Sequence, residues 1–190
     1  MTQPYGELSN PDTLTIERLL PGPVERVWQY LTDPELRRQW LAAGPMTLEP
    51  DGEVELRFHN SQLSGAEDTP PAKYAQYDDE HIQRGTILAC EPHRLLRFTW
   101  PMGDEMTEVS FELSPQGEKV KLVIRHSLLQ RGEHLLSVAS GWHTHLAFLL
   151  ARLEQQQPPA FWATIAETEA EYAQIAGHTQ IGRASCRERV

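Results

Sequence analysis

The spacing of hydrophobic residues predicts helices and strands in a definite order along the chain. Residues 13–20 (TLTIERLL) alternate between apolar and polar side chains, as a strand does. Apolar residues then recur every three or four positions in two segments, 21–31 and 32–41, which predicts two short helices in tandem. Asp33 can cap the second helix and Pro34 can occupy its first position. The chain is therefore expected to open with one strand and two short helices.

From residue 52 the hydrophobic period falls to two, which indicates a sheet. Val54, Leu56 and Phe58 alternate with charged residues. Four more alternating segments follow, namely QRGTILACE, HRLLRFTW, EMTEVSFELS and KVKLVIRHSL, with short turns between them. Short turns favour antiparallel neighbours. A polar loop at 60–82 separates the first of these strands from the others, and loops of this length are commonly functional or disordered.

A long helix is predicted after the sheet, entered irregularly near Gly141. Its apolar residues form one stripe, consisting of Trp142, Leu146, Leu149 and Leu153. Since two positions correspond to about 200° of helical rotation, His143 and His145 point in nearly opposite directions and cannot bind one metal ion. Pro158 and Pro159 end this helix. A further helix is expected over 160–176, with its apolar side formed by Phe161, Ile165, Thr168, Tyr172 and Ile175. Strands followed by helices indicate an α+β fold.

The 190 residues suit one domain with a sizeable core. We interpret residues 1–11 as an N-terminal extension, 12–180 as a single domain, and 181–190 as a non-native tail with no apolar face. The net charge of −10 argues against nucleic acid or an anionic membrane as the main partner. The absence of a long apolar run and of a leader pattern predicts a cytoplasmic protein. The two cysteines, Cys90 and Cys186, provide no disulfide framework.

Four segments together resemble a known family. The segments are VERVWQYLTDPELRRQW, EPHRLLRFTW, LVIRHSLL and GWHTHLAFLLARLE. They are similar to homologues of the activator of heat-shock protein 90 ATPase (AHSA-like proteins), within the START-like, SRPBCC superfamily, over about residues 12–154. The resemblance implies a helix-grip fold, in which a curved antiparallel sheet wraps around a long C-terminal helix and leaves a cavity between them. It places the Trp142 stripe against the sheet, His143 and His145 on the flanks, and suggests a role in the stress response.

The resemblance implies that the cavity binds a hydrophobic small molecule. Strict strand alternation supplies candidate lining residues, which are Phe58, Phe98, Trp100, Phe111, Ile124 and His126, joined by Trp142 and Leu146 from the helix. Their large side chains either fill the space themselves or form the wall of a ligand site. A buried His126 is either satisfied by neighbouring protein groups or able to orient a ligand or transfer a proton. A register slip of one residue would turn His126 outward and Arg125 inward.

The other polar candidates have simpler interpretations. Arg18, Arg97 and Arg125 are expected on solvated strand faces, although one at the cavity mouth could hold a ligand carboxylate. His81, His93 and His143 are expected at the surface. The acidic group formed by Asp68, Asp78, Asp79 and Glu80 lacks calcium-loop spacing and is expected to be solvated. No phosphate loop, nucleophile elbow or zinc motif occurs, so no catalytic residue, metal or cofactor is predicted.

Three functions remain open at this point. The leading hypothesis is non-catalytic binding of a small hydrophobic or amphipathic molecule. An alternative is a co-chaperone-like interaction module that binds a chaperone or other protein, or forms a homodimer through the Phe161 and Tyr172 side of the last helix. The third is a START-like cyclase or dehydratase, whose chemistry would need His126 or a nearby acid in an open cavity.

Overall fold

The computed structural model describes residues 5–10, 12–64, 68–77, 79–129 and 133–187. The strands are β1 (Glu7–Asn10), β2 (Thr13–Pro21), β3 (Glu53–Phe58), β4 (His81–Glu91), β5 (Leu95–Met102), β6 (Glu105–Gln116) and β7 (Lys119–Ser127). The α-helices are α1 (Val24–Thr32), α2 (Pro34–Arg37), α3 (Glu133–Leu153) and α4 (Phe161–Arg187), and the 3-10 helices are η1 (Asn60–Gln62) and η2 (Ala72–Tyr77). None of the helices in these ranges is both long and apolar enough to cross a membrane.

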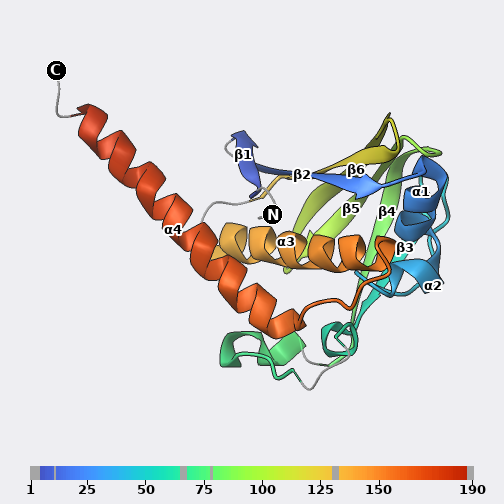
Figure 1. The fold of residues 1–190 in the computed structure, drawn as a ribbon, viewed down its shortest axis with the longest axis horizontal. Coiled ribbons are helices and arrows are strands. Elements are labelled where there is room, and N and C mark those ends of the chain that lie inside the picture. Colours follow the sequence, from blue (N-terminus) through green and yellow to red (C-terminus); the bar gives the residue numbers. More distant parts are fainter. Residues whose placement is uncertain (1–4, 11, 65–67, 78, 130–132, 188–190) are drawn as a thin grey trace.

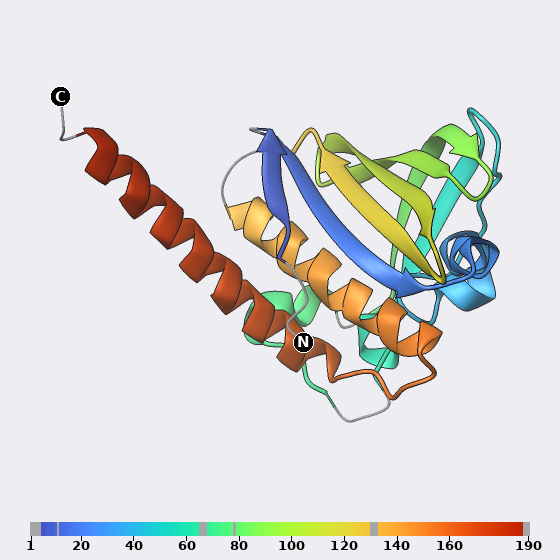
Figure 2. The same cartoon turned by 45° about the horizontal axis from the view of Figure 1, so that its top comes forward.

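Within the described ranges the strands form one antiparallel sheet in the order β1-β2-β7-β6-β5-β4-β3. The second strand pairs with the last, with Leu14 opposite His126 and Leu20 opposite Val120. The sheet curves over α3, which lies along its concave side (Figures 1 and 2). This is the α+β helix-grip architecture expected from the sequence.

The predicted inward faces of the strands are confirmed. Phe58 on β3, Phe98 on β5, Phe111 on β6 and Ile124 on β7 are all buried. Cross-strand register brings Phe98 opposite Val109 and Phe111 opposite Ile124. Since side chains of a strand alternate between its two faces, the apolar residues at every second position form the core with α3.

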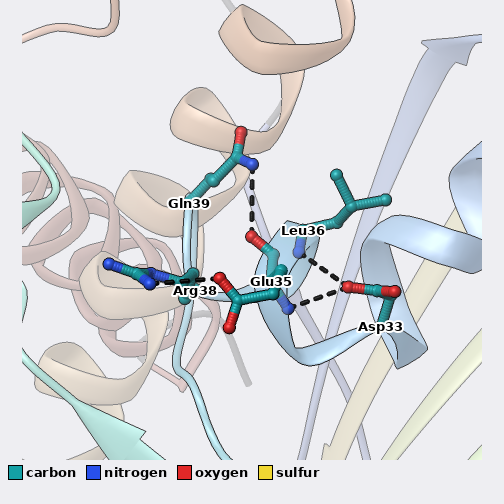
Figure 3. A network of polar contacts seen from close by, with 5 residues as sticks. All are labelled: Asp33, Glu35, Leu36, Arg38 and Gln39. Carbon is teal, nitrogen blue, oxygen red and sulfur yellow. Dashed lines mark hydrogen bonds and ion pairs between the residues drawn. The ribbon is translucent and has the colours of Figure 1, made fainter.

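The helix α2, which follows α1 directly, begins at a side-chain cap. The Asp33 carboxylate accepts hydrogen bonds from the backbone N–H groups of Glu35 (2.8 Å) and Leu36 (3.1 Å), which are otherwise unpaired at the start of α2 (Figure 3). Arg38 forms an exposed ion pair with Glu35 at 3.1 Å (Figure 3). The predicted cap at Asp33 and the first helical position of Pro34 are therefore confirmed.

Arg37 is fully buried and links the end of α1 to the turn that follows α2. Its guanidinium donates to the backbone carbonyls of Thr32 (3.0 Å), Ala42 (3.2 Å) and Gly44. Burial lowers the pKa of Arg37 to about 10, so the side chain is still charged at neutral pH. The carbonyls at the end of α1 and in the turn that follows α2 are thus satisfied by one cation.

The helix α3 is continuous through Gly141, so the predicted irregular entry is wrong. It is also buried on almost every side, because the sheet covers one face and α4 packs on the other (Figure 2). As a result His143 and His145 are each only 8% exposed. The expectation of a surface position for His143 fails because α4 covers that flank of α3.

The helix α4 begins after Pro159 as predicted and continues past residue 176 to Arg187. Phe161, Ile165, Thr168 and Tyr172 pack inward, whereas Ile175 is 43% exposed. The Phe161 ring lies 5.6 Å from that of Phe148 on α3. The apolar side of α4 therefore packs within the chain.

The segment at 60–82 and the N-terminal segment both pack on α4. The Trp162 indole donates to Ser61 Oγ at 3.0 Å and stacks on Tyr74, with ring centroids 6.0 Å apart. Asp68 accepts from the backbone N–H of Trp162 at 2.6 Å, so it satisfies the start of α4 instead of being merely solvated. Asp78 lies outside the described residues.

The predicted N-terminal extension contains β1, and the Gly6 N–H donates to the Tyr172 hydroxyl at 2.7 Å.

Candidate ligand-binding cavity

A cavity of about 570 Å³ lies between the N-terminal half of α3 and the end of the sheet where β5 turns into β6. Its lining residues come from α3, from the strand ends and from the loops around them: Leu41, Phe58, Tyr77, Gln83, Trp100, Met102, Gly103, Asp104, Glu105, Thr107, His126, Leu129, Ser137, Val138, Gly141, Trp142 and His145. The α3 contributors occupy one helical face, since they recur at intervals of four. The wall is aromatic and apolar at its centre and acidic at the hairpin turn.

Four of the sequence-predicted lining residues face this cavity, namely Phe58, Trp100, His126 and Trp142. The other four, Phe98, Phe111, Ile124 and Leu146, do not line it and are at most 1% exposed. The physical reason is their position along the strands and the helix. Phe98 and Phe111 lie further along their strands from the β5–β6 turn, and their side chains pack on one another with ring centroids 5.7 Å apart. Phe111, for example, packs edge-on against Trp142 at 5.7 Å.

The sequence analysis did not predict several of the lining residues, and no single sequence pattern identifies all of them. Strand alternation puts Gln83 on the same face of β4 as the buried Ile87, so the sequence pattern could have identified it as a lining residue. Tyr77, by contrast, comes from the 60–82 segment, and no local pattern places it near the sheet. His145 was expected on a flank of α3, but it lies on the same helical face as the other cavity-lining residues of that helix.

His126 is held by hydrogen bonds on both ring nitrogens. The Trp142 indole N–H donates to Nδ1 at 3.1 Å, so the proton of the neutral ring is on Nε2. Nε2 donates to Thr107 Oγ1 at 2.7 Å, and the Thr107 hydroxyl donates to the Trp100 carbonyl at 2.6 Å. Burial lowers the pKa of His126 to about 3, so the imidazole is neutral at physiological pH. Of the two hypotheses for His126, the structure therefore supports the one in which neighbouring protein groups satisfy its hydrogen bonds.

His145 has a different environment, with one nitrogen occupied and one available. Its Nδ1 lies 2.7 Å from the backbone carbonyl oxygen of Trp40, which can only accept, so Nδ1 carries the proton. Burial, in first place, lowers the pKa of His145 to about 4. The neutral ring therefore keeps a bare lone pair on Nε2, and no described residue donates to it. His145 is a cavity-lining hydrogen-bond acceptor.

Gly141 explains part of the open space. A Cβ built on this residue would meet no heavy atom within 4 Å outside its own helix backbone and its chain neighbours. A glycine inside a helix costs about 1 kcal/mol relative to alanine. At this position the missing side chain leaves volume in the cavity wall that a larger residue would occupy.

The arginines predicted on strand faces fall into two groups. Arg97 pairs with Glu108 at 2.6 Å, and Arg125 pairs with Glu112, both on the outer face of the sheet. Arg18 is only 3% exposed, so the prediction of a solvated face is wrong for this residue. It occupies the inward position between Ile16 and Leu20 on β2 and does not line the cavity.

Comparison with known proteins places this fold in a family. The family model described as Activator of Hsp90 ATPase homolog 1-like protein matches residues 21–154. The chain belongs to this family. The matched range includes the tandem helices, β3 to β7 and the whole of α3, and therefore all the residues that line the cavity. A comparison with curated proteins gave no match.

Several solved structures share the fold of this chain. The solution structure of the protein encoded by gene BPP1335 of Bordetella parapertussis is 44% identical, with a TM-score of 0.76 over 92% of this chain and 95% of that chain. CalU16 of Micromonospora echinospora is 24% identical, with a TM-score of 0.63 over 85% and 86%. DynU16, from the dynemicin biosynthetic locus, is 20% identical, with a TM-score of 0.61 over 80% of this chain and 51% of that chain. The last two show a likeness of fold alone.

Proposed function

We propose that this protein binds a small apolar or amphipathic organic molecule in the cavity between α3 and the β5–β6 end of the sheet, and that it performs no chemical step of its own. The observation that carries the proposal is the cavity itself. Its volume of about 570 Å³ is in the range of small-molecule sites, which are typically apolar with a few placed polar groups. Phe58, Trp100 and Trp142 supply the apolar wall.

The contacts around these rings support a preformed site. The Trp100 ring lies 5.3 Å from that of Trp142 and 5.6 Å from that of Phe58. The indole of Trp142 is fixed by its hydrogen bond to His126. Rings held by each other and by a hydrogen bond lose little further freedom when a ligand binds, which lowers the entropic cost of binding.

A catalytic role through His126 has less support. Both ring nitrogens are engaged within the protein, and the low pKa keeps the ring neutral. A general acid or base needs a nitrogen that reaches the substrate and a pKa near the working pH. The co-chaperone alternative, which the description of the family suggests, would need a surface other than the apolar side of α4, because that side packs on α3.

Substitution of Gly141 tests the proposal without disturbing the fold. We expect Gly141→Leu to fill the cavity and abolish ligand binding, while Gly141→Ala, the matched control, retains it. Both variants should be at least as stable as the parent, since alanine and leucine favour the helix over glycine. The measurement is a thermal-shift and tryptophan-fluorescence screen of the full chain against fatty acids, sterols, flavonoids, aromatic acids and aromatic amines.

Saturable binding by the parent and by Gly141→Ala, lost in Gly141→Leu, would support the cavity as the binding site. Equal binding by all three proteins would place the ligand elsewhere and contradict the proposal. The absence of any ligand across the panel would also contradict it, and the search would then turn to a protein partner.

A further inference from the structure

We propose that the cavity selects organic cations, that is, molecules with an apolar or aromatic body and a protonated amine, over carboxylates of the same size. This inference rests on the proposed function and names the ligand class of the same site. Three features carry it: the charges at the rim, the acceptors in the wall and the aromatic rings between them.

The charged groups that line the cavity are all acidic. Asp104 lies in the turn between β5 and β6, Glu105 is the first residue of β6, and no lysine or arginine is among the described lining residues. None of the ion pairs between described residues includes either carboxylate. The arginines of the adjoining strands point away, since Arg97 pairs with Glu108 on the outer face of the sheet. The rim carboxylates would repel a ligand carboxylate and attract an ammonium group.

Two polar groups deeper in the wall offer hydrogen-bond acceptors without a donor among the described residues. His145 is nine-tenths buried, and its Nε2 carries a lone pair with no donor among the described residues, because its proton is committed to the Trp40 carbonyl. Gln83 has a buried Oε1 with no partner in the described part of the chain. Because Gln83 Oε1 is buried without a donor, it costs free energy that a ligand with an N–H group would recover, and His145 Nε2 offers a second acceptor for such a group. His126 adds no competing charge, because its ring is neutral and internally bonded.

The aromatic rings add a second attraction for cations. Phe58, Tyr77, Trp100 and Trp142 all line the cavity. The faces of such rings carry negative partial charge and bind ammonium groups, tryptophan most strongly. In an aromatic or alkyl amine, the apolar body would pack on the aromatic wall. The ammonium group would be attracted to the ring faces and the rim carboxylates and would donate to the acceptors. The overall charge of −10 acts in the same direction by raising the local concentration of cations.

The test uses three compounds with the same ring system and different head groups: 1-naphthylmethylamine, 1-naphthalenemethanol and 1-naphthoic acid. Binding to the full chain is measured by titration calorimetry at pH 7.5 in low salt. We expect the amine to bind at least about tenfold more tightly than the acid, with the neutral alcohol between them. The preference should shrink in 1 M NaCl, because exposed carboxylates are screened.

Two double variants separate local recognition from overall charge. Asp104→Asn with Glu105→Gln removes the rim carboxylates and should reduce the preference for the amine several-fold. Glu49→Gln with Glu118→Gln changes the net charge equally at exposed positions outside the cavity lining and should leave the preference unchanged.

The outcomes distinguish this inference from the proposed function. If the acid binds as tightly as the amine, or if the rim variant keeps the full preference, the inference is wrong while ligand binding in the cavity stands. If none of the three compounds binds and the wider panel also gives no ligand, the proposed function fails and the inference fails with it.

Discussion

Mild acid, below about pH 6.5, should destabilise this protein, because three of its histidines are buried in the neutral form. His126, His143 and His145 are 1%, 8% and 8% exposed, and burial lowers their pKa values to about 3, 4 and 4. Their ordinary value is about 6.5, so between pH 6.5 and 4 the unfolded chain binds protons that the folded chain refuses. The free energy of unfolding is therefore highest above neutral pH and falls as the pH is lowered through 6.5.

The size of the effect follows from these values. At pH 5 each histidine favours the unfolded state by about 2 kcal/mol, since a shift of one pKa unit corresponds to about 1.4 kcal/mol. The three together lower the free energy of unfolding by about 6 kcal/mol between pH 7.5 and pH 5. That loss is comparable with the whole stability of many domains, which is about 5–15 kcal/mol. His81, whose pKa burial also lowers, acts in the same direction.

The measurement is urea-induced unfolding, followed by tryptophan fluorescence at several pH values from 7.5 to 5. Near pH 5.5 the free energy of unfolding should change by about 4 kcal/mol per pH unit, equivalent to uptake of about three protons. His126→Leu or His143→Phe should each reduce this slope by about one proton, whatever the variant does to stability at pH 7.5. A free energy that stays constant from pH 7.5 to 5, or a slope that neither variant reduces, would refute the reasoning.

Three further variants test the contacts that hold the fold. Thr107→Val leaves the Nε2–H of His126 without an acceptor and should cost about 2 kcal/mol in urea unfolding, whereas the exposed Thr69→Val should cost almost nothing. Arg37→Met leaves several buried carbonyls unpaired and should cost about 3 kcal/mol, while an unchanged unfolding midpoint would show that those bonds contribute nothing. Asp68→Ala should cost about 1 kcal/mol by chemical denaturation and Asp68→Asn much less, and equal losses would contradict the role of its oxygen as a hydrogen-bond acceptor at the start of α4.

The cavity shows where prediction from sequence reaches its limit. The inward faces of β3, β5, β6 and β7 were predictable, because side-chain direction alternates along a strand. Which inward residues contact the cavity was not, because that depends on where the curved sheet separates from α3. Phe98 and Trp100 are on the same face of β5, yet only Trp100 lines the cavity. Tyr77 and Asp104 reach the site from segments without periodic pattern.

The sequence by itself determined the order and type of the main elements from β2 onward, the inward faces of β3, β5, β6 and β7, and the cap at Asp33, because each depends on residues within one turn or one strand of each other. The tertiary structure alone decided the burial of His143, which depends on α4 covering a helix flank that local spacing leaves open. It also decided the role of Asp68, which bonds to Trp162 far along the chain. Contacts of this kind are made by segments brought together only by folding, so no local pattern encodes them.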